Sequence, residues 1–250
     1  MDSTRRFSNR VEDYVKYRPH YPRQIISFLE EQYDLDNKKV IADIGAGTGI
    51  SSIPFLEAGY KVMAVEPNKE MLGKAIEVLG NFPDFSPVDG TAENTGLPKH
   101  SVDAIIAGQA FHWFDRDKCK TEFRRILKKD GVLALIWNER LSETPFEKAY
   151  DALIVQHAID YVKVDHRNIK DEDIALFFDP ALMQLNVFPN KQVFDYEGLK
   201  GRLLSSSYMP SPKDAGHDEM LEDLQRLFDR YKENELIVIN YATNLYSGIL

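Results

Sequence analysis

A glycine-rich turn and a carboxylate stand at the ends of two neighbouring apolar runs in this chain. The first run, residues 40–44, leads into Gly45-Ala46-Gly47-Thr48-Gly49, and the second, residues 61–65, is followed by Glu66. Glycines let a ligand approach the backbone closely, and a carboxylate at the tip of the next strand can accept hydrogen bonds from ribose hydroxyls. This pairing predicts a site for a cofactor that contains adenosine.

The residues around the turn favour one such cofactor over another. A dinucleotide fingerprint, G-x-G-x-x-G, requires a glycine at position 50, and this chain has Ile50 there. The turn contains no lysine or arginine to meet a phosphate, and Asp43, just before it, would repel a pyrophosphate. S-adenosylmethionine has a ribose, no phosphate and a cationic amino-acid tail that Asp43 would attract. The turn therefore favours S-adenosylmethionine over a nicotinamide dinucleotide.

A third motif follows the next predicted strand. Residues 89–93 read Asp-Gly-Thr-Ala-Glu and precede Gly-Leu-Pro at 96–98 and Ser-Val-Asp at 101–103. Together with the turn, this stretch resembles the class I S-adenosylmethionine-dependent methyltransferases of the type 11 group. The resemblance implies S-adenosylmethionine as methyl donor, S-adenosylhomocysteine as product and no metal. The residues that it implies for the cofactor are Asp43, Gly45, Ala46, Gly47 and Thr48 at the turn, Glu66, Pro67 and Met71 beside the ribose and adenine, Thr91, Ala92 and Glu93 along the adenine, and Gln109 at the polar end.

The loop 108–114, Gly-Gln-Ala-Phe-His-Trp-Phe, comes directly off the fourth predicted strand, where the methyl group would face the acceptor. His112 has two roles open to it. An imidazole with a pKa of about 6.5 can take a proton from a hydroxyl or amine acceptor, or the neutral ring can orient the loop. Trp113 is expected to form a wall of the acceptor pocket.

The amino-terminal segment is rich in aromatic residues, which predicts a lid over the cofactor; the alternative is a helix packed on the sheet. Its F…Y…R-P-x-Y-P pattern resembles the opening of small-molecule methyltransferases that also carry the H-W-F loop, a group related to the trans-aconitate methyltransferases. Tyr14 and Arg18 are expected to reach the cofactor, and Tyr17, Arg202 and Tyr208 are the candidates for contacts with the acceptor.

Composition limits the partners. The 250 residues carry a net charge of -9, which repels a nucleic-acid backbone. Cys119 is the single cysteine, so no internal disulfide can form, and no apolar run approaches the 18 or so residues of a membrane span. We expect a cytoplasmic protein that acts on a small molecule, without nucleic-acid or membrane partners. The oligomeric state stays open.

Strand-like and helix-like patterns alternate from 40 to 137, which predicts an α/β fold with a doubly wound, mostly parallel sheet. The resemblance implies seven strands and an antiparallel C-terminal hairpin. We expect one domain over 1–250, with an N-terminal lid at 1–33 and a helical cap inserted at about 140–180. The expected strands are 39–44, 61–66, 85–88, 102–107, 132–137, 182–188, 192–196 and 236–245, and the expected helices are 50–58, 68–79, 116–128, 145–161, 171–178, 198–206 and 218–232.

These patterns predict methyl transfer from S-adenosylmethionine to a small acceptor by in-line displacement. Two other functions stay open. A non-catalytic regulatory protein that binds S-adenosylmethionine would have the same turn but no acceptor cavity. A nicotinamide-dependent oxidoreductase would share the sheet and the ribose carboxylate, although Ile50 and Asp43 disfavour it.

Overall fold

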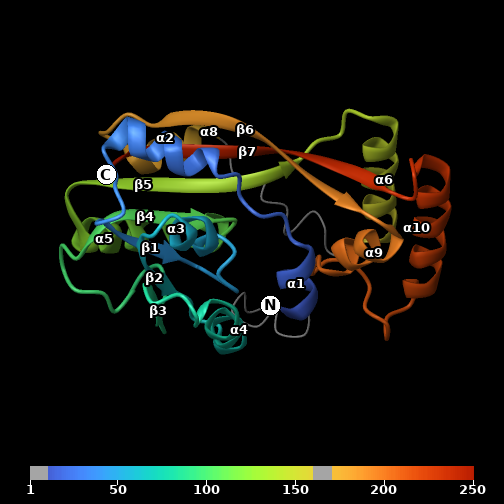
Figure 1. Ribbon diagram of the computed structural model, residues 1–250, viewed down its shortest axis with the longest axis horizontal. Coiled ribbons are helices and arrows are strands. Elements are labelled where there is room, and N and C mark those ends of the chain that lie inside the picture. The colour runs from blue at the N-terminus through green and yellow to red at the C-terminus, as the bar shows by residue number, and fades with distance from the viewer. Residues whose placement is uncertain (1–10, 160–170) are drawn as a thin grey trace.

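The computed structural model describes residues 11–159 and 171–250, so the expectations for residues 1–10 and 160–170 lie outside the described chain. The described residues form a seven-stranded sheet in the order β3-β2-β1-β4-β5-β7-β6 (Figure 1). Pairing is parallel from β3 to β5, and β7 is antiparallel to both of its neighbours. The fold class expected from the sequence is therefore confirmed. The strands are β1 (Val40–Ile44), β2 (Lys61–Val65), β3 (Phe85–Val88), β4 (Val102–Gly108), β5 (Leu127–Arg140), β6 (Gln184–Phe194) and β7 (Ile237–Ile249).

Helices cover both faces of the sheet, which explains why β1 and β4 are apolar on both sides. One face packs against α2 (Gln24–Tyr33) and α3 (Ser52–Glu57). The other packs against α5 (Arg116–Ile126) and α8 (Asp171–Phe178). The helix α4 (Lys69–Leu79) lies beside β3 and begins at Asn68, whose side chain accepts a hydrogen bond from the Met71 N–H. The helices on the two faces hold the carboxyl ends of the strands in place, and the candidate site lies at those ends.

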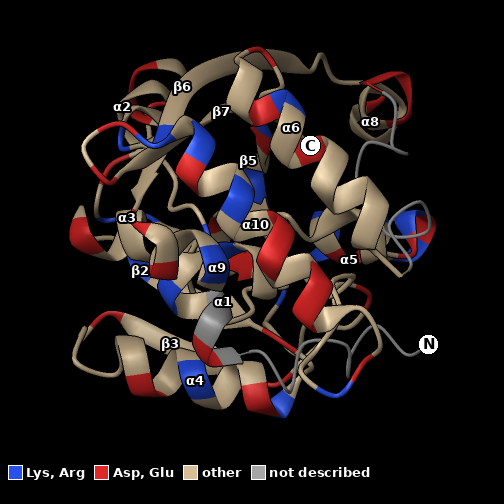
Figure 2. Cartoon of the chain, turned by 90° about the vertical axis from the view of Figure 1, so that its right-hand side faces the viewer, with Lys and Arg blue, Asp and Glu red and all other residues tan. Residues whose placement is uncertain are grey.

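A third hydrophobic cluster, besides those on the two faces of the sheet, forms a cap beyond the carboxyl ends of the parallel strands (Figure 1). It consists of α6 (Pro145–His157), α9 (Tyr196–Leu204) and α10 (His217–Tyr231), together with the first residues of β7. Figure 2 views the molecule from this side and shows acidic and basic residues on the cap helices.

The cap differs from the expected segment at about 140–180. Of that segment, α6 belongs to the cap, whereas α8 packs on the sheet because Ile174, Phe177 and Phe178 join the cluster that contains Phe123. The helices α9 and α10, which follow that segment, complete the cap.

Part of the segment expected to form a lid, 1–33, packs on the sheet instead. The helix α2 is a layer of the sheet, with Ile25, Ile26 and Leu29 in its core. The helix α1 (Val11–Tyr17) lies between the two parts of the molecule and contacts both α9 and α4 (Figure 1).

The C-terminal strands are longer than predicted. The two strands expected at 182–188 and 192–196 are one continuous strand, β6, paired along its length with β7. Pro189 interrupts the sequence pattern but not the strand, because β6 lies at the edge of the sheet, where a missing N–H is tolerated. Similarly, β5 continues to Arg140, three residues beyond its expected end.

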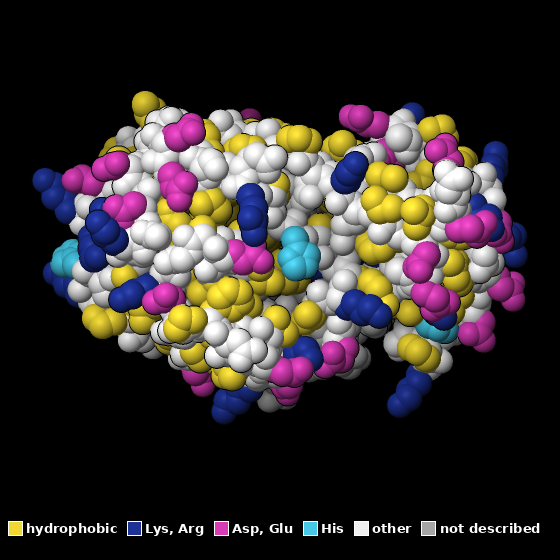
Figure 3. Space-filling view, in the orientation of Figure 1, with side chains coloured by type: hydrophobic (Ala, Val, Ile, Leu, Met, Phe, Trp, Pro, Cys, Tyr) yellow, Lys and Arg dark blue, Asp and Glu magenta, His cyan; other side chains and the backbone are white. Residues whose placement is uncertain are grey.

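Charges of both signs are interspersed over the face seen in Figure 3. Among the described helices, none combines the length and the apolar character needed to cross a membrane.

Candidate functional site

The glycine-rich turn lies at the carboxyl end of β1, and the N–H groups of Gly45 and Ala46 donate hydrogen bonds to the Val65 carbonyl at the end of β2, at 2.9 and 3.1 Å. Gly47 has a φ of 58°, in the left-handed region that favours glycine. A Cβ added there would meet only the Met71 methyl group, at 3.4 Å. At Gly47 the turn therefore presents bare backbone with room above it, and Met71 lies beside that space.

Glu66 connects the turn to the next strand. Its Oε2 accepts a hydrogen bond from the Gly47 N–H, and its Oε1 accepts one from the Asn68 N–H, both at 2.8 Å. The side chain is buried, and burial raises the pKa of Glu66, although the two N–H donors oppose that effect. A carboxylate oxygen can accept two hydrogen bonds, so both oxygens keep capacity for a ligand hydroxyl.

Asp43 is fully buried under the same turn. Its Oδ2 accepts hydrogen bonds from the Ser51 and Ser52 hydroxyls at the start of α3, each at 2.7 Å. Burial raises the pKa of Asp43 to about 6, against the effect of the two serines. Within the described chain, Asp43 Oδ1 and the Thr48 hydroxyl are buried without a hydrogen-bond partner. The turn thus has unused polar atoms of both acceptor and donor type.

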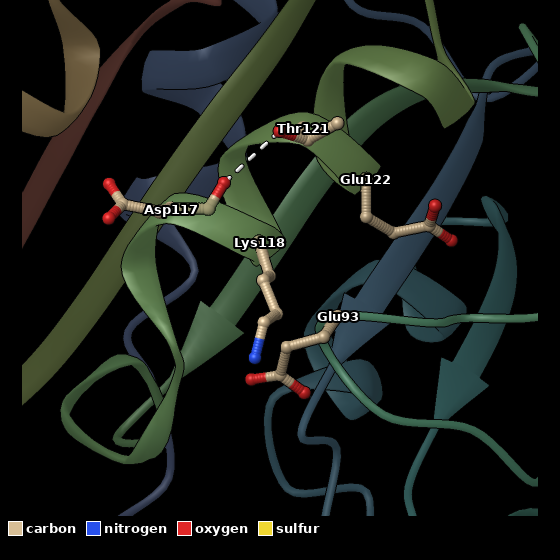
Figure 4. A pocket seen from close by; sticks show the side chains of 5 residues that line it. All are labelled: Glu93, Asp117, Lys118, Thr121 and Glu122. Atoms are coloured by element: carbon tan, nitrogen blue, oxygen red, sulfur yellow. Dashed lines mark hydrogen bonds between the residues drawn. The ribbon is translucent and has the colours of Figure 1, made fainter.

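The loop after β3 lies close to α5. Ala92 is buried, and Glu93 Oε1 accepts a hydrogen bond from the Asp115 N–H at 2.9 Å. Glu93 also lines a surface pocket of about 450 Å³ with residues of α5, where Lys118 points toward it and Glu122 points away (Figure 4). Glu93 therefore ties the loop to the helix, and its expected contact with adenine stays a prediction.

The loop after β4 begins at Gln109, whose N–H donates to the Ile136 carbonyl at 2.9 Å and whose Nε2 donates to the Asn138 carbonyl at 3.1 Å. The turn that follows, η2 (Phe111–Trp113), buries Phe111 in the core. The rings of His112 and Trp113 lie 4.7 Å apart, and Trp113 is 37% exposed. Trp113 is therefore exposed at the carboxyl end of β4, whereas His112 beside it is half-buried.

The remaining candidates meet where α1 touches α9. The Tyr17 ring fills the space over Gly201, and Arg18 Nη2 donates to the Ser205 carbonyl at 2.9 Å. Arg202 is buried and donates from Nε to the Tyr241 hydroxyl at 3.1 Å. Tyr14 lies in α1, but its side chain is outside the described part.

Several polar residues at the site were not identified from the sequence. Ser51 and Ser52 hold Asp43, and Asn138 and Arg140 lie at the end of β5. Because ligands bind at the carboxyl ends of parallel strands, polar residues that follow the fifth predicted strand are a usable signal. The sequence pattern ends that strand at Trp137, three residues before the end of β5 at Arg140.

Comparison with known proteins assigns the family. Residues 42–135 match the model of a methyltransferase domain. An uncharacterised methyltransferase-like protein of Schizosaccharomyces pombe is 31% identical over 97% of this chain and 94% of its own length. A second uncharacterised methyltransferase of that yeast is 29% identical over 98% of this chain and 96% of its own.

A solved structure has the same fold. It is described as a type II methyltransferase from Anaeromyxobacter dehalogenans and superimposes with a TM-score of 0.72 at 23% identity, covering 93% of this chain and 98% of that one. With relatives that match nearly end to end, a doubly wound sheet and a glycine turn joined to a strand-end carboxylate, this chain belongs to the class I S-adenosylmethionine-dependent methyltransferases.

Proposed function

We propose that this methyltransferase binds S-adenosylmethionine on the turn between β1 and α3 and transfers its methyl group to a small molecule held under the cap. The observation that carries the proposal is the hydrogen bond from the Gly47 N–H to Glu66, which sets a ribose-type carboxylate beside open backbone. The buried, unpartnered atoms of Asp43 and Thr48 supply further capacity in the same place among the described residues.

The proposed cofactor contacts follow the strand ends. Glu66 would hold the ribose hydroxyls, and the backbone of the turn would hold the methionine half. Met71 and Pro67 would pack on the ribose and adenine. The complete proposed set is Tyr14, Arg18, Asp43, Gly45, Ala46, Gly47, Thr48, Glu66, Pro67, Met71, Thr91, Ala92, Glu93 and Gln109.

When bound, S-adenosylmethionine supplies both the electrophilic methyl carbon and its leaving group. The protein then has to align the acceptor atom with that carbon and exclude water. In this proposal the cap and α1 exclude water, Trp113 forms a wall of the acceptor pocket, and Tyr17, Arg202 and Tyr208 contact the acceptor. His112 would orient the loop or take a proton from a hydroxyl or amine acceptor.

A small acceptor is supported by two features. The net charge of -9 disfavours a nucleic acid. In addition, a helical cap with its own hydrophobic core lies beyond the carboxyl ends of the parallel strands (Figure 1).

Two experiments on the full chain test this proposal. Calorimetric titration with S-adenosylhomocysteine should give one site per chain, and titration with NADH should give none. Release of S-adenosylhomocysteine should then be measured with a panel of small acids, phenols and amines. Failure of S-adenosylhomocysteine to bind folded protein would refute the cofactor assignment, and binding without turnover on any member of a broad panel would favour a regulatory protein.

In an active assay, His112→Ala separates the two roles of this residue. If the imidazole acts as a base, turnover should fall far more than the affinity for S-adenosylhomocysteine. Equal losses would assign it the orienting role.

A further inference from the structure

Arg202 is a buried guanidinium that has no carboxylate partner among the described residues. Its side chain lies inside the cap, and the residue is 5% exposed. It donates to the Tyr241 hydroxyl at 3.1 Å, to the Ser206 hydroxyl at 3.3 Å and to the Ser205 hydroxyl at 3.5 Å. Neutral hydroxyls compensate a buried charge poorly, and an uncompensated ion in the interior is strongly unfavourable.

Two more guanidinium groups approach the same place. Arg18 reaches the Ser205 carbonyl from α1, and Arg140 lies 5.1 Å from the centre of the Tyr150 ring at the end of β5. We call Arg18, Arg140 and Arg202 the arginine cluster. Asp151, which accepts a hydrogen bond from Arg140 Nε at 3.1 Å, is the carboxylate that the described contacts give to the cluster.

The positive charges of the cluster act on a neighbouring phenol, Tyr208. Burial by itself raises the pKa of Tyr208, but the charges of the arginine cluster and a hydrogen bond with Ser206 together outweigh burial, and the pKa of Tyr208 is lowered overall. The interior at this point therefore favours negative charge, in a protein whose net charge is -9.

Tyr150 gives a second, independent observation at the same place, a hydroxyl that is not used in a hydrogen bond within the described structure. It is 1% exposed, and its hydroxyl is buried without a hydrogen-bond partner in the described structure. A buried phenol normally finds a partner. Its ring lies next to Arg140, so the unused donor stands in the same positive environment.

The cluster lies on the side of the proposed acceptor. In the sheet, Gly108 pairs with Ile136, and Arg140 is four residues further along β5, which corresponds to about 13 Å of extended strand. Arg140 pairs with Tyr241 of β7, whose hydroxyl accepts from Arg202. The arginine cluster thus lies between the sheet and the cap, beyond the loop that carries Gln109 and His112.

We propose that the arginine cluster and the Tyr150 hydroxyl bind an oxyanion group of the methyl acceptor, a carboxylate or a phosphate. This proposal reassigns Arg18 from the cofactor to the acceptor. This assignment rests on the proposed function, because the proposed function is what places a methyl acceptor under the cap. A guanidinium presents a planar fork of donors that matches both kinds of oxyanion, and the phenol adds a donor.

The test uses Arg202→Met, which removes the charge and keeps an unbranched side chain. Arg226→Met is the matched control, because Arg226 is an exposed arginine on α10 bonded to Asp223. Melting temperatures of the full chain are measured at constant ionic strength with millimolar succinate, with glycerol phosphate and with the neutral analogue succinamide. We expect succinate or glycerol phosphate to raise the melting temperatures of the wild type and of Arg226→Met, and succinamide to leave both unchanged. The melting temperature of Arg202→Met should not change with any of the three compounds.

A second variant guards against a failure of Arg202→Met to fold. Tyr150→Phe removes only an oxygen atom that has no hydrogen-bond partner among the described residues, so the fold should be kept while the affinity for the effective oxyanion falls about five- to tenfold. Stabilisation by succinate would indicate recognition of a carboxylate, and stabilisation by glycerol phosphate would indicate recognition of a phosphate.

The inference is overturned if neither oxyanion stabilises the wild type more than succinamide does. It is also overturned if the stabilisation persists in Arg202→Met or if Tyr150→Phe leaves the affinity unchanged. Titration of the wild type with S-adenosylhomocysteine is run separately, because its failure would remove the proposed function and not the anion site.

Discussion

Glu66 and Asp43 are both buried carboxylates near one turn, but their surroundings differ. Glu66 accepts two backbone N–H groups and lies next to the open backbone of Gly47. Asp43 lies one layer deeper and is engaged by Ser51 and Ser52. At the scale of single residues, Glu66 is therefore suited to the ribose. Asp43 holds the turn against α3 through Oδ2 and keeps Oδ1 for the proposed cofactor.

Replacing Glu66 tests the ribose assignment. We expect Glu66→Ala to weaken binding of S-adenosylhomocysteine by about 1 to 3 kcal/mol, because charged hydrogen bonds to the ribose are lost. Glu70→Ala, an exposed carboxylate in the first turn of α4, is the matched control and should bind normally. Calorimetric titration measures both, and an unchanged affinity in Glu66→Ala would remove this residue from the ribose site.

Asp43 makes stability depend on pH. Its pKa is about 6 in the native state and near 3.8 in an unfolded chain. Between these values the native state holds a proton that the unfolded chain has released, so raising the pH through this window lowers the free energy of unfolding. The loss contributed by Asp43 is about 3 kcal/mol.

The variant Asp43→Asn lacks this titration. Urea unfolding at pH 4 and pH 7 should therefore show the variant gaining stability relative to the wild type as the pH rises. Stability differences that are the same at both pH values would contradict the assignment.

Among the elements, those with a strong local pattern were predictable from the sequence. The strands β1, β2 and β4 are β-branched and apolar, and Asn68 and Asp115 cap α4 and α5. The turn at 45–49 and Glu66 could be placed at one edge because parallel strands present their carboxyl ends together.

Contacts that depend on distant segments could not be predicted. The length of β6 is set by pairing with β7, some 50 residues later, and the sequence around Pro189 gives the opposite signal. Likewise, the position of α8 on the sheet depends on Phe177 meeting Phe111 and Phe123. No local pattern distinguishes an amphipathic helix of the cap from one that covers the sheet.

The contact between α1 and α9 depends on one glycine. A Cβ at Gly201 would overlap the Tyr17 ring, so we expect Gly201→Ala to displace α1 and destabilise the protein by about 1 to 3 kcal/mol. Gly73→Ala is the control, because the space around Gly73 in α4 is open and alanine favours a helix by up to about 1 kcal/mol. Urea unfolding of both variants checks the prediction. If Gly201→Ala were as stable as the wild type, the Tyr17 ring would move aside without cost, and the prediction would be wrong.

The whole molecule is connected by three long strands. The strands β5, β6 and β7 pair next to the parallel sheet, and the first residues of β7, Ile237 and Ile239, enter the core of the cap. The cap cannot unfold alone without separating residues of β7 from their partners. The strand β7 therefore belongs to both the sheet and the cap.

This continuity predicts cooperative unfolding. Scanning calorimetry of the full chain should show one transition, with equal calorimetric and van't Hoff enthalpies. Two separated transitions would show that the cap is an independent unit and would contradict a single domain.

The central claim is that the turn between β1 and α3 binds the cofactor, and one paired titration tests it most directly. Gly47→Val and Gly216→Val both place a side chain on a backbone of positive φ, at 58° and 83°, but Gly216 lies at the start of α10 in the cap. Calorimetric titration with S-adenosylhomocysteine should show binding to the wild type and to Gly216→Val and none to folded Gly47→Val. Normal binding to Gly47→Val would contradict the account, because the cofactor would then lie elsewhere.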